Sequence, residues 1–459
     1  MCGIVGYVGG REAREVLIDG LKRLEYRGYD SAGLALGSGK DLLIIKEVGK
    51  VEDLERMLKE VPAGSHQGIG HTRWATHGGV SRVNAHPHKD GSGRFALVHN
   101  GIIENFLELR DELKREGVVF LSETDTEAIV HLVAMSFSRT GDILETLVYL
   151  QKRLRGTFAL ALMQQGRPDT IYAIRRGSPL VLGSGEGEAF CASDIPAFLP
   201  YTRRIQYPEE GDIAEISPGG IRIWDEKGRP VERPSVTVDW DVSLTEKSGF
   251  SHYMLKEIHE QGTVLRRSLK GRIVDGKTTI SGELGWDVEM VSKWKKIHIV
   301  ACGSSFYSAL VAERLLEKWT DLDIKVDIAS EYRYRPVACD PSTLAVFVSQ
   351  SGETADTLAA LRKARAGGAH CLAITNVRGS TLTREVHSLL LLKAGSEIGV
   401  AATKSFIGQL AALFLVALQL GSMRGSLALH EEERLVNELV RIPHKVELLL
   451  EKESEVREI

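Results

Sequence analysis

One pattern in the second half of the chain strongly limits the folds that it can adopt. An apolar run at residues 296–302 leads through a polar turn to a helical stretch at 306–319, and a second apolar run at 344–348 leads to a helical stretch at 355–366. A third apolar run follows at 371–375. Alternation of strands and helices at this spacing predicts a doubly wound parallel sheet. Ligands of such sheets bind outside the carboxyl ends of the strands.

Two hydroxyl-rich loops follow the first two apolar runs, and each leads into a helix. They are Gly303-Ser304-Ser305 and Ser349-Gln350-Ser351-Gly352-Glu353-Thr354. The free N–H groups and the dipole of a helix N-terminus favour a bound phosphate. Ser and Thr at helix starts more often cap the helix than bind a ligand, so the loops alone leave both interpretations open.

The first 215 or so residues have a different pattern, in which short strand-like runs alternate with turns. Examples are 96–99 and 158–163, and helical periodicity occurs around 11–24 and 126–136. This pattern suits sheets packed between helices. We therefore expect an α+β domain, followed by an α/β domain.

Cys2 follows the initiator Met1 directly. Removal of Met1 would make Cys2 the N-terminal residue, which would then carry both a thiol nucleophile and an α-amine that can accept its proton. The alternative is a small buried residue at the start of an ordinary strand, because cysteine is among the residue types most often buried.

Four further segments accompany Cys2. They are residues 27–33 (Arg-Gly-Tyr-Asp-Ser-Ala-Gly), 71–78 (His-Thr-Arg-Trp-Ala-Thr-His-Gly), 99–105 (His-Asn-Gly-Ile-Ile-Glu-Asn) and 122–127 (Ser-Glu-Thr-Asp-Thr-Glu). In this order they resemble the class II glutamine amidotransferases, and within that class the glutamine:fructose-6-phosphate amidotransferase family. The resemblance implies an N-terminal-nucleophile sandwich of sheets between helices, with Cys2 as the nucleophile and glutamine as the substrate.

The same resemblance gives roles to the other residues of a glutamine site. Arg73 would bind the α-carboxylate of glutamine and Asp125 its α-ammonium group, although either residue taken singly is more often a surface charge. The Asn100 side-chain amide and the Gly101 N–H would stabilise the oxyanion. Thr76 and His77 would line the pocket, and Trp74 would gate the passage through which ammonia leaves.

The two hydroxyl-rich loops resemble those of the SIS (sugar isomerase) fold. The resemblance implies that the phosphate of fructose 6-phosphate is held by Ser304, Ser305, Ser349, Gln350, Ser351 and Thr354. Glu397 to Ala401, with Lys404, match a further segment along the sugar site, and Val400 would contact the sugar through its backbone. The expected product is glucosamine 6-phosphate.

These assignments divide the chain into four parts. We expect a glutamine amidotransferase domain at 1–217, the end of that domain and a linker at 218–252, the first SIS domain with its entry helices at 253–428, and an amphipathic helical connection at 429–459. The synthases of this family carry a second SIS lobe with further catalytic residues. Nothing here matches those residues, so this chain alone is expected to be a glutaminase with a partial sugar-phosphate site and to be homodimeric in its full-length form.

Other functions were weighed against this one. Amidophosphoribosyltransferase and asparagine synthetase share the glutaminase module, but the SIS loops exclude both. A sugar-phosphate-binding SIS sensor with a vestigial amidotransferase domain is the alternative. His71, His77, His86 and His88 lie close together but lack the spacing of a zinc signature, so we expect no metal and no cofactor.

Composition limits the partners and the compartment. A formal net charge of −4 gives no basic surface for nucleic acid or for an anionic membrane. The five cysteines form an odd number with no CxxC pair, which favours a reducing compartment and therefore the cytoplasm. The most apolar stretch, Leu410 to Leu418, is too short to cross a bilayer, so it predicts a buried core helix.

Overall fold

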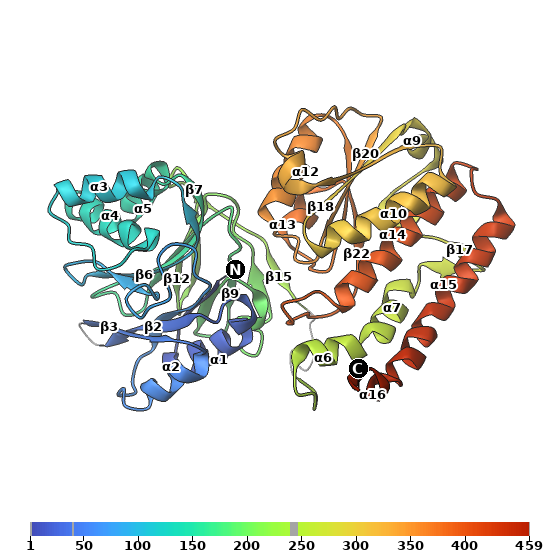
Figure 1. Ribbon diagram of the computed structural model, residues 1–459. Coiled ribbons are helices and arrows are strands. Elements are labelled where there is room, and N and C mark those ends of the chain that lie inside the picture. Colours follow the sequence, from blue (N-terminus) through green and yellow to red (C-terminus); the bar gives the residue numbers. More distant parts are fainter. Residues whose placement is uncertain (1, 39–40, 239–246, 459) are drawn as a thin grey trace. The chain divides into compact units, whose positions relative to one another are not determined.

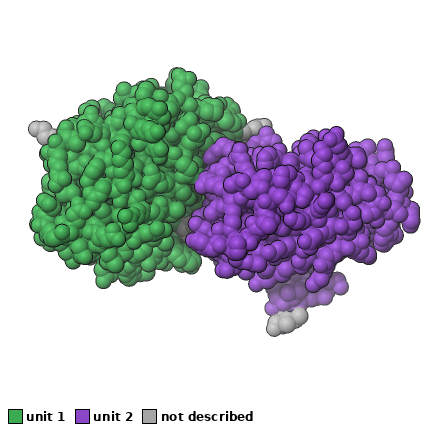
Figure 2. Space-filling view, turned by 90° about the horizontal axis from the view of Figure 1, so that it is seen from above, with its two compact units in different colours: residues 1–242 green, residues 243–459 purple. Residues whose placement is uncertain are grey.

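The computed structural model describes residues 2–38, 41–238 and 247–458. The chain divides into two units, residues 1–242 and 243–459, which Figure 2 shows in different colours. The predicted linker residues Asp239, Trp240 and Asp241 lie outside the described residues. Each unit has its own sheets and core and is described by itself.

Two antiparallel sheets form the centre of the first unit (Figure 1). One has eight strands in the order β15 (Ser235–Thr237), β11 (Arg204–Gln206), β9 (Val181–Ser184), β10 (Ala189–Ala192), β1 (Gly3–Val8), β4 (Gln67–Arg73), β2 (Ser31–Ser38) and β3 (Asp41–Val48). The other has seven, in the order β14 (Pro230–Val231), β13 (Gly220–Trp224), β12 (Ile213–Ser217), β8 (Ile171–Arg176), β7 (Gly156–Gln164), β6 (Phe95–Ile103) and β5 (His88–Lys89).

Helices cover the outer faces of these sheets. The inner faces share one buried core, which includes Ile4 and Ile69 from one sheet and Val98 and Ala161 from the other. Helices α1 (Ala13–Leu24) and α2 (Val51–Leu58) pack on the eight-stranded sheet. Helices α3 (Phe106–Arg115), α4 (Asp125–Thr140) and α5 (Ile143–Arg153) pack on the seven-stranded sheet, and two short 3-10 helices lie at Glu25–Arg27 and Ile195–Ala197. The predicted sandwich of sheets between helices is confirmed.

Only two of these five helices were predicted, namely α1 and α4. The α4 helix has clear end signals, since the Thr124 side chain caps its first turn and Gly141 ends it in the left-handed conformation. The α3 helix buries only Leu109 and Leu113, one turn apart. Its ten residues also carry fewer repeats of the helical period than the sixteen residues of α4.

A five-stranded parallel sheet forms the centre of the second unit. Its order is β19 (Asp323–Ile328), β18 (Lys296–Ala301), β20 (Thr343–Ser349), β21 (His370–Thr375) and β22 (Ser388–Leu391). After β18 the chain forms β19 at one edge of the sheet, and it then returns to form β20, β21 and β22 on the other side of β18. The topological switch point therefore lies between β18 and β20, as the predicted doubly wound fold requires.

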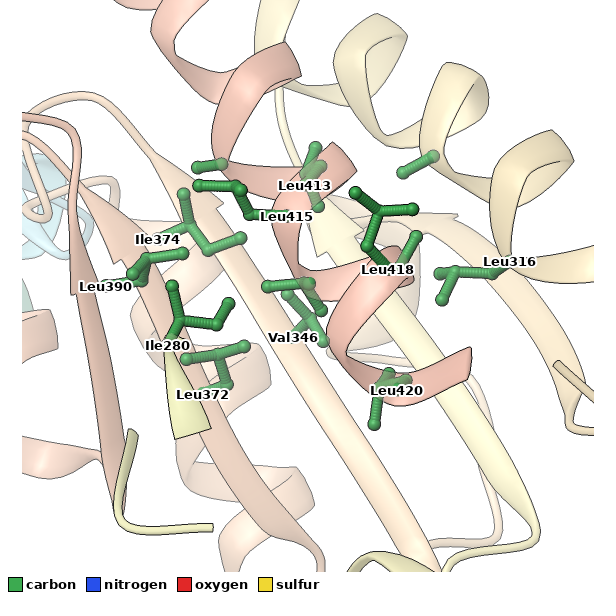
Figure 3. Packing of buried hydrophobic residues seen from close by; sticks show 14 of the residues in the cluster. Ile280, Leu316, Val346, Leu372, Ile374, Leu390, Leu413, Leu415, Leu418 and Leu420 are labelled. Carbon is green, nitrogen blue, oxygen red and sulfur yellow. The ribbon is translucent and has the colours of Figure 1, made fainter. Parts of the chain in front are cut away.

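Each face of this sheet packs on helices. Val346 points into one core with α10 (Ser304–Trp319), α14 (Lys404–Met423) and α7 (Gln261–Leu269), and Figure 3 shows part of this packing. Phe347, the next residue, points into the other core with α11 (Ala329–Tyr332) and α12 (Ala355–Ala366). The remaining elements are α6 (Tyr253–His259), β16 (Ile273–Val274), β17 (Lys277–Thr278), α8 (Ser281–Leu284), α9 (Val288–Lys293), α13 (Thr381–Glu385), α15 (Leu429–Leu450) and α16 (Glu453–Arg457).

The α14 helix contains the apolar run at 410–418. At 20 residues it is long and apolar enough to cross a membrane by length and composition, but 67% of its most apolar stretch is buried inside the protein. Leu413, Leu415 and Leu418 belong to the buried core that α14 shares with Val346 and Ile374 of the parallel sheet (Figure 3). The prediction of a buried core helix is confirmed, and the helix is longer than its apolar run.

The C-terminal stretch forms two helices where one was expected. The α15 helix ends at Leu450, and α16 begins at Glu453. The residues that α15 buries lie between Glu432 and Pro443, whereas α16 buries none. Without apolar burial, little tertiary packing supports a continuous helix beyond Leu450.

Candidate active site

Cys2 lies immediately before β1, beside the end of β4. The antiparallel pairing places Gly3 opposite Thr72, which brings Cys2 to Trp74. The Trp74 N–H donates a hydrogen bond to Cys2 Sγ at 3.1 Å, and the thiol lies 3.5 Å from the Trp74 carbonyl oxygen. Cys2 therefore occupies a fixed position at a strand end and is only partly exposed.

The surroundings of Cys2 disfavour a spontaneous thiolate. Burial raises the pKa of the Cys2 thiol, and the hydrogen bond from Trp74 opposes this only in part. Among the described residues, both hydrogen bonds of Cys2 Sγ are with the backbone of Trp74. Attack by this thiol thus needs a base that takes its proton during the reaction.

Asn100 reaches Cys2 from the other sheet. Its Nδ2 donates to the Cys2 carbonyl oxygen at 2.8 Å, and its Oδ1 lies 2.9 Å from His71 Nε2. The next residue, Gly101, has a φ of 132°, and a Cβ there would overlap the Thr157 carbonyl oxygen. Only glycine fits this backbone without strain. The two predicted oxyanion donors are consecutive residues of β6.

Arg73 is the last residue of β4 and is 3% exposed. Its Nη1 donates to Gly79 O at 3.2 Å, and its Nη2 donates to His77 O at 2.5 Å and to Gly78 O at 3.1 Å. Burial lowers the pKa of the Arg73 guanidinium, and the nearby Cys2, Asp30 and Asp125 side chains oppose that effect. The predicted carboxylate-binding cation thus also holds the loop that follows β4.

Asp125 begins α4 and is 4% exposed. Its Oδ2 accepts a hydrogen bond from Ile103 N at 2.9 Å, and its Oδ1 lies 3.9 Å from His99 Nδ1. A helix N-terminus stabilises a negative charge. The carboxylate is therefore a buried anion attached to the end of the strand that carries Asn100.

The other predicted pocket residues lie on the loop after β4. Trp74 is 41% exposed, and its ring meets Tyr29 edge-on at 5.3 Å. Thr76 is exposed, and His77 is partly buried against Phe106, with the ring centres 4.8 Å apart.

Sequence reasoning did not single out two supports of this loop. Asp30 Oδ2 accepts a hydrogen bond from Ala75 N at 2.7 Å. Asn84 Nδ2 donates to Gly79 O at 3.0 Å, and Asn84 Oδ1 accepts from Glu123 N at 3.0 Å. Asp30 and Glu123 belong to two of the four segments quoted above. The sequence pattern therefore included both residues but indicated no role for either.

Three of the clustered histidines, His71, His86 and His88, form a buried group of neighbouring rings. The ring centres of His71 and His86 are 4.2 Å apart, and those of His86 and His88 are 5.0 Å apart. Burial lowers the pKa of all three imidazoles, that of His71 to about 3. Within residues 2–38, 41–238 and 247–458, no group of three or more His, Cys, Asp or Glu side chains is arranged to hold a metal ion.

The hydroxyl-rich loops lie at the carboxyl edge of the parallel sheet. Because Ala301 pairs with Val348, the turn after β18 and the loop after β20 leave the sheet side by side at its switch point. Gly303 has a φ of 60° and Gly352 a φ of 67°, and a Cβ on Gly352 would overlap Ser380 Oγ. The backbone of both loops thus depends on glycine.

Hydrogen bonds fix most of the predicted phosphate-binding side chains. Ser349 Oγ lies 3.1 Å from Thr354 Oγ1 and accepts from Gly352 N at 3.1 Å. Ser351 Oγ accepts from Glu353 N at 3.2 Å, and Gln350 O accepts from Asn376 N at 3.1 Å. Ser304 begins α10 and is exposed, whereas Ser305 is buried and its Oγ accepts from Gln409 Nε2 at 2.9 Å. These contacts make the loop compact, but several of the hydroxyl groups already have partners within the protein.

The segment before α14 is attached to α6. Glu257 is 2% exposed, and its carboxylate accepts from Ile398 N at 2.5 Å and from Gly399 N at 3.0 Å. Val400, which follows, is 71% exposed. Lys404 Nζ is buried and lies 2.5 Å from Glu260 Oε2, so this matched lysine is paired with the residue that joins α6 to α7.

Two family descriptions match the chain. Residues 71–200 match the family described as a glutamine amidotransferase domain, and residues 290–419 match the SIS domain family. The first range contains Arg73, Asn100 and Asp125, and the second contains both hydroxyl-rich loops.

Two relatives that match nearly the whole chain carry the same name. A glutamine–fructose-6-phosphate aminotransferase (isomerizing) of Symbiobacterium thermophilum is 50% identical over 100% of this chain and 75% of its own length. Its namesake in Thermus thermophilus is 49% identical over 98% of this chain and 74% of its own length. Among solved structures, the C-terminal domain of glucosamine-fructose-6-phosphate aminotransferase from Francisella tularensis is 38% identical over 46% of this chain and 59% of that chain, with a TM-score of 0.44.

Proposed function

The chain belongs to the glutamine–fructose-6-phosphate aminotransferase family, and we propose that Cys2 is the nucleophile with which it releases ammonia from glutamine. One observation carries this proposal. Asn100, which comes from the other sheet, contacts the same residue that carries the thiol, since its Nδ2 lies 2.8 Å from the Cys2 carbonyl oxygen. A nucleophile beside a fixed hydrogen-bond donor is the arrangement that acyl transfer needs.

The proposed reaction begins with removal of Met1. The free α-amine of Cys2 then takes the thiol proton, and the sulfur attacks the side-chain carbonyl carbon of glutamine. The Asn100 amide and the Gly101 N–H stabilise the resulting oxyanion. Collapse of this intermediate breaks the C–N bond, and the protonated nitrogen leaves as ammonia. Water then hydrolyses the glutamyl thioester, which yields glutamate and restores the thiol.

The remaining charged groups select glutamine. Arg73 binds the α-carboxylate and Asp125 the α-ammonium group, so a substrate must carry both charges at the correct separation. Thr76 and His77 line the pocket, and Trp74 gates the passage of ammonia. Arg73 and Asp125 interact electrostatically, and the Asp125 carboxylate favours the charged form of the Arg73 guanidinium. A cation and an anion near each other in one site support this assignment, because glutamine carries both charges.

The second unit uses the ammonia. We propose that the loops after β18 and β20 hold the phosphate of fructose 6-phosphate through Ser304, Ser305, Ser349, Gln350, Ser351 and Thr354, and that Val400 contacts the sugar through its backbone. Ammonia condenses with the C2 ketone of the open-chain sugar and water leaves. Proton transfer from C1 to C2 then gives glucosamine 6-phosphate. Glutamine and fructose 6-phosphate are the substrates of the complete reaction.

The setting of this reaction is also proposed. A cytoplasmic enzyme with no nucleic-acid or membrane partner fits the net charge of −4 and the five cysteines, which are free. The full-length form is proposed to be a homodimer. The alternative of a sugar-phosphate sensor with a vestigial amidotransferase domain is disfavoured, because the relatives named above are aminotransferases.

The test concerns the N-terminus. Cys2→Ala is expected to abolish glutamine hydrolysis, measured as glutamate release, whereas Cys339→Ala is expected to leave it unchanged as a control for loss of a thiol. A chain verified by intact mass to retain Met1 should be nearly inactive, because its Cys2 nitrogen is an amide. Normal turnover by the Met1-retaining chain would refute the proposed mechanism.

A further inference from the structure

A chain of hydrogen bonds connects Cys2 to a buried histidine. Asn100 Nδ2 lies 2.8 Å from the Cys2 carbonyl oxygen, and Asn100 Oδ1 lies 2.9 Å from His71 Nε2. The same His71 nitrogen lies 3.0 Å from the His99 carbonyl oxygen. The inner face of β4 carries Ile69 and His71, because side chains two residues apart share a face, and this face packs on the sheet that contains β6.

The partners of His71 Nε2 determine which ring nitrogen carries the proton. The His99 carbonyl oxygen can only accept a hydrogen bond, so Nε2 must donate. His71 is fully buried, which keeps the imidazole neutral, so a neutral ring with its proton on Nε2 is the form that fits the site. The Asn100 atom that receives this N–H must then be the oxygen.

We propose that His71 is a positioning residue that fixes the orientation of the Asn100 amide, so that Nδ2 faces the reacting carbonyl. This inference rests on the proposed function, in which Asn100 stabilises the oxyanion. The two orientations of an asparagine amide have nearly the same shape. Packing alone therefore selects poorly between them, whereas the His71 N–H at Oδ1, together with the Cys2 carbonyl oxygen at Nδ2, selects one. The reversed amide would direct its oxygen at the developing negative charge.

The surroundings of His71 keep its own ring in place. The ring packs against His86 with a centre-to-centre distance of 4.2 Å, and β4 pairs His71 with Ile4 of β1 and with Gly33 of β2. A donor on a central strand stays fixed throughout the reaction. Preorganised donors of this kind need no rearrangement when charge develops.

The first experiment compares substitutions at His71 that remove the N–H donor with one that restores a donor. His71→Phe keeps a ring against His86 but removes the donor, and His71→Leu is a second donor-free variant if the Phe protein does not fold. His71→Gln places a side-chain N–H near the position of Nε2. We expect the donor-free variant to lower kcat for glutamine hydrolysis about tenfold or more, with KM within about threefold of wild type, and His71→Gln to recover most of this loss. Equal losses in the donor-free and Gln variants would overturn the inference.

The second experiment separates this inference from the proposed function. Asn100→Ala should lower kcat by about 10²–10³. If His71 acts only through Asn100, adding the donor-free substitution to Asn100→Ala should cost less than about threefold more. A further loss of about tenfold in that background would refute the positioning role while leaving Asn100 as an oxyanion donor. An unchanged kcat in Asn100→Ala would instead refute the oxyanion assignment within the proposed function.

Discussion

Glu127→Gln should destabilise the first unit strongly at neutral pH. The Glu127 carboxylate is 2% exposed and accepts hydrogen bonds from Leu121 N at 2.7 Å, from Ser122 N at 2.6 Å and from Ser122 Oγ at 2.6 Å. His131 Nε2 lies 3.6 Å away, one turn along α4. Burial alone would raise the pKa of Glu127, but the nearby His131 ring and the hydrogen bonds from Leu121 and Ser122 outweigh it and lower the pKa to about 2.

The magnitude follows from this pKa. The usual value of 4.5 exceeds the value in the folded chain, so ionised Glu127 stabilises the fold, and this contribution is complete above about pH 4.5. At about 1.4 kcal/mol per pH unit the full contribution is about 3 kcal/mol. It decreases as the pH falls toward 2, and about 1 kcal/mol remains at pH 3. The amide side chain of the variant cannot ionise, so the difference in stability between wild type and variant should follow the same curve.

The assay must report on the first unit alone, because a chain with two units need not unfold in one step. Hydrogen exchange of peptides from residues 125–140, measured between pH 3 and pH 7 in increasing denaturant, gives the free energy of unfolding around α4. Glu108→Gln is the matched control, since Glu108 is exposed on α3. A difference below about 1 kcal/mol at pH 7, or one that does not shrink toward pH 3, would contradict the reasoning.

Other substitutions test the two proposed substrate sites. Arg73→Ala should weaken glutamine binding by about 2 kcal/mol or more and raise the KM for glutamine. It should hardly slow alkylation of Cys2 by a label that lacks a carboxylate. Equal losses of glutamine turnover and of alkylation rate would show that the role of Arg73 is structural. Gly101→Ala should lower kcat for glutamine hydrolysis about 10²-fold or more, because its Cβ would overlap Thr157 O, and near-normal kcat would contradict this backbone geometry. Ser349→Ala combined with Thr354→Ala should weaken fructose 6-phosphate binding in calorimetry, and unchanged affinity would exclude both hydroxyl groups as phosphate ligands.

The parallel sheet could be predicted because its central strands are buried on both faces. In β18 and β20 nearly every residue is buried, so these strands appear in the sequence as continuous apolar runs. The loops after them contain the glycines and hydroxyl groups that the switch point uses. By contrast, α2 and α5 have only 8 and 11 residues, so each offers few repeats of the helical period among the neighbouring strands and turns.

The residue types of the proposed site could be chosen from the sequence, but the contacts between them could not. Arg73, Asn100 and Asp125 are the side chains that a zwitterionic amide substrate requires, and their segments are distinctive. The contact between His71 and Asn100 could not be predicted in this way, because it depends on how two separate sheets face each other. No spacing within the sequence specifies that β4 presents His71 to Asn100 on β6.

The state of Arg73 connects substrate binding to the loop after β4. Its guanidinium donates to the carbonyl oxygens of His77, Gly78 and Gly79. Under the proposed function, a glutamine carboxylate must compete with these neutral carbonyl acceptors, and it can do so because it adds a second charge and can accept two parallel hydrogen bonds from the guanidinium. Asn84 Nδ2 also donates to Gly79 O, so this carbonyl keeps a partner when Arg73 turns to the substrate. The affinity for glutamine then depends on the difference between the hydrogen bonds that Arg73 makes to the substrate and those that it makes to the 77–79 loop. A substitution that loosens this loop therefore changes the affinity without contacting the substrate.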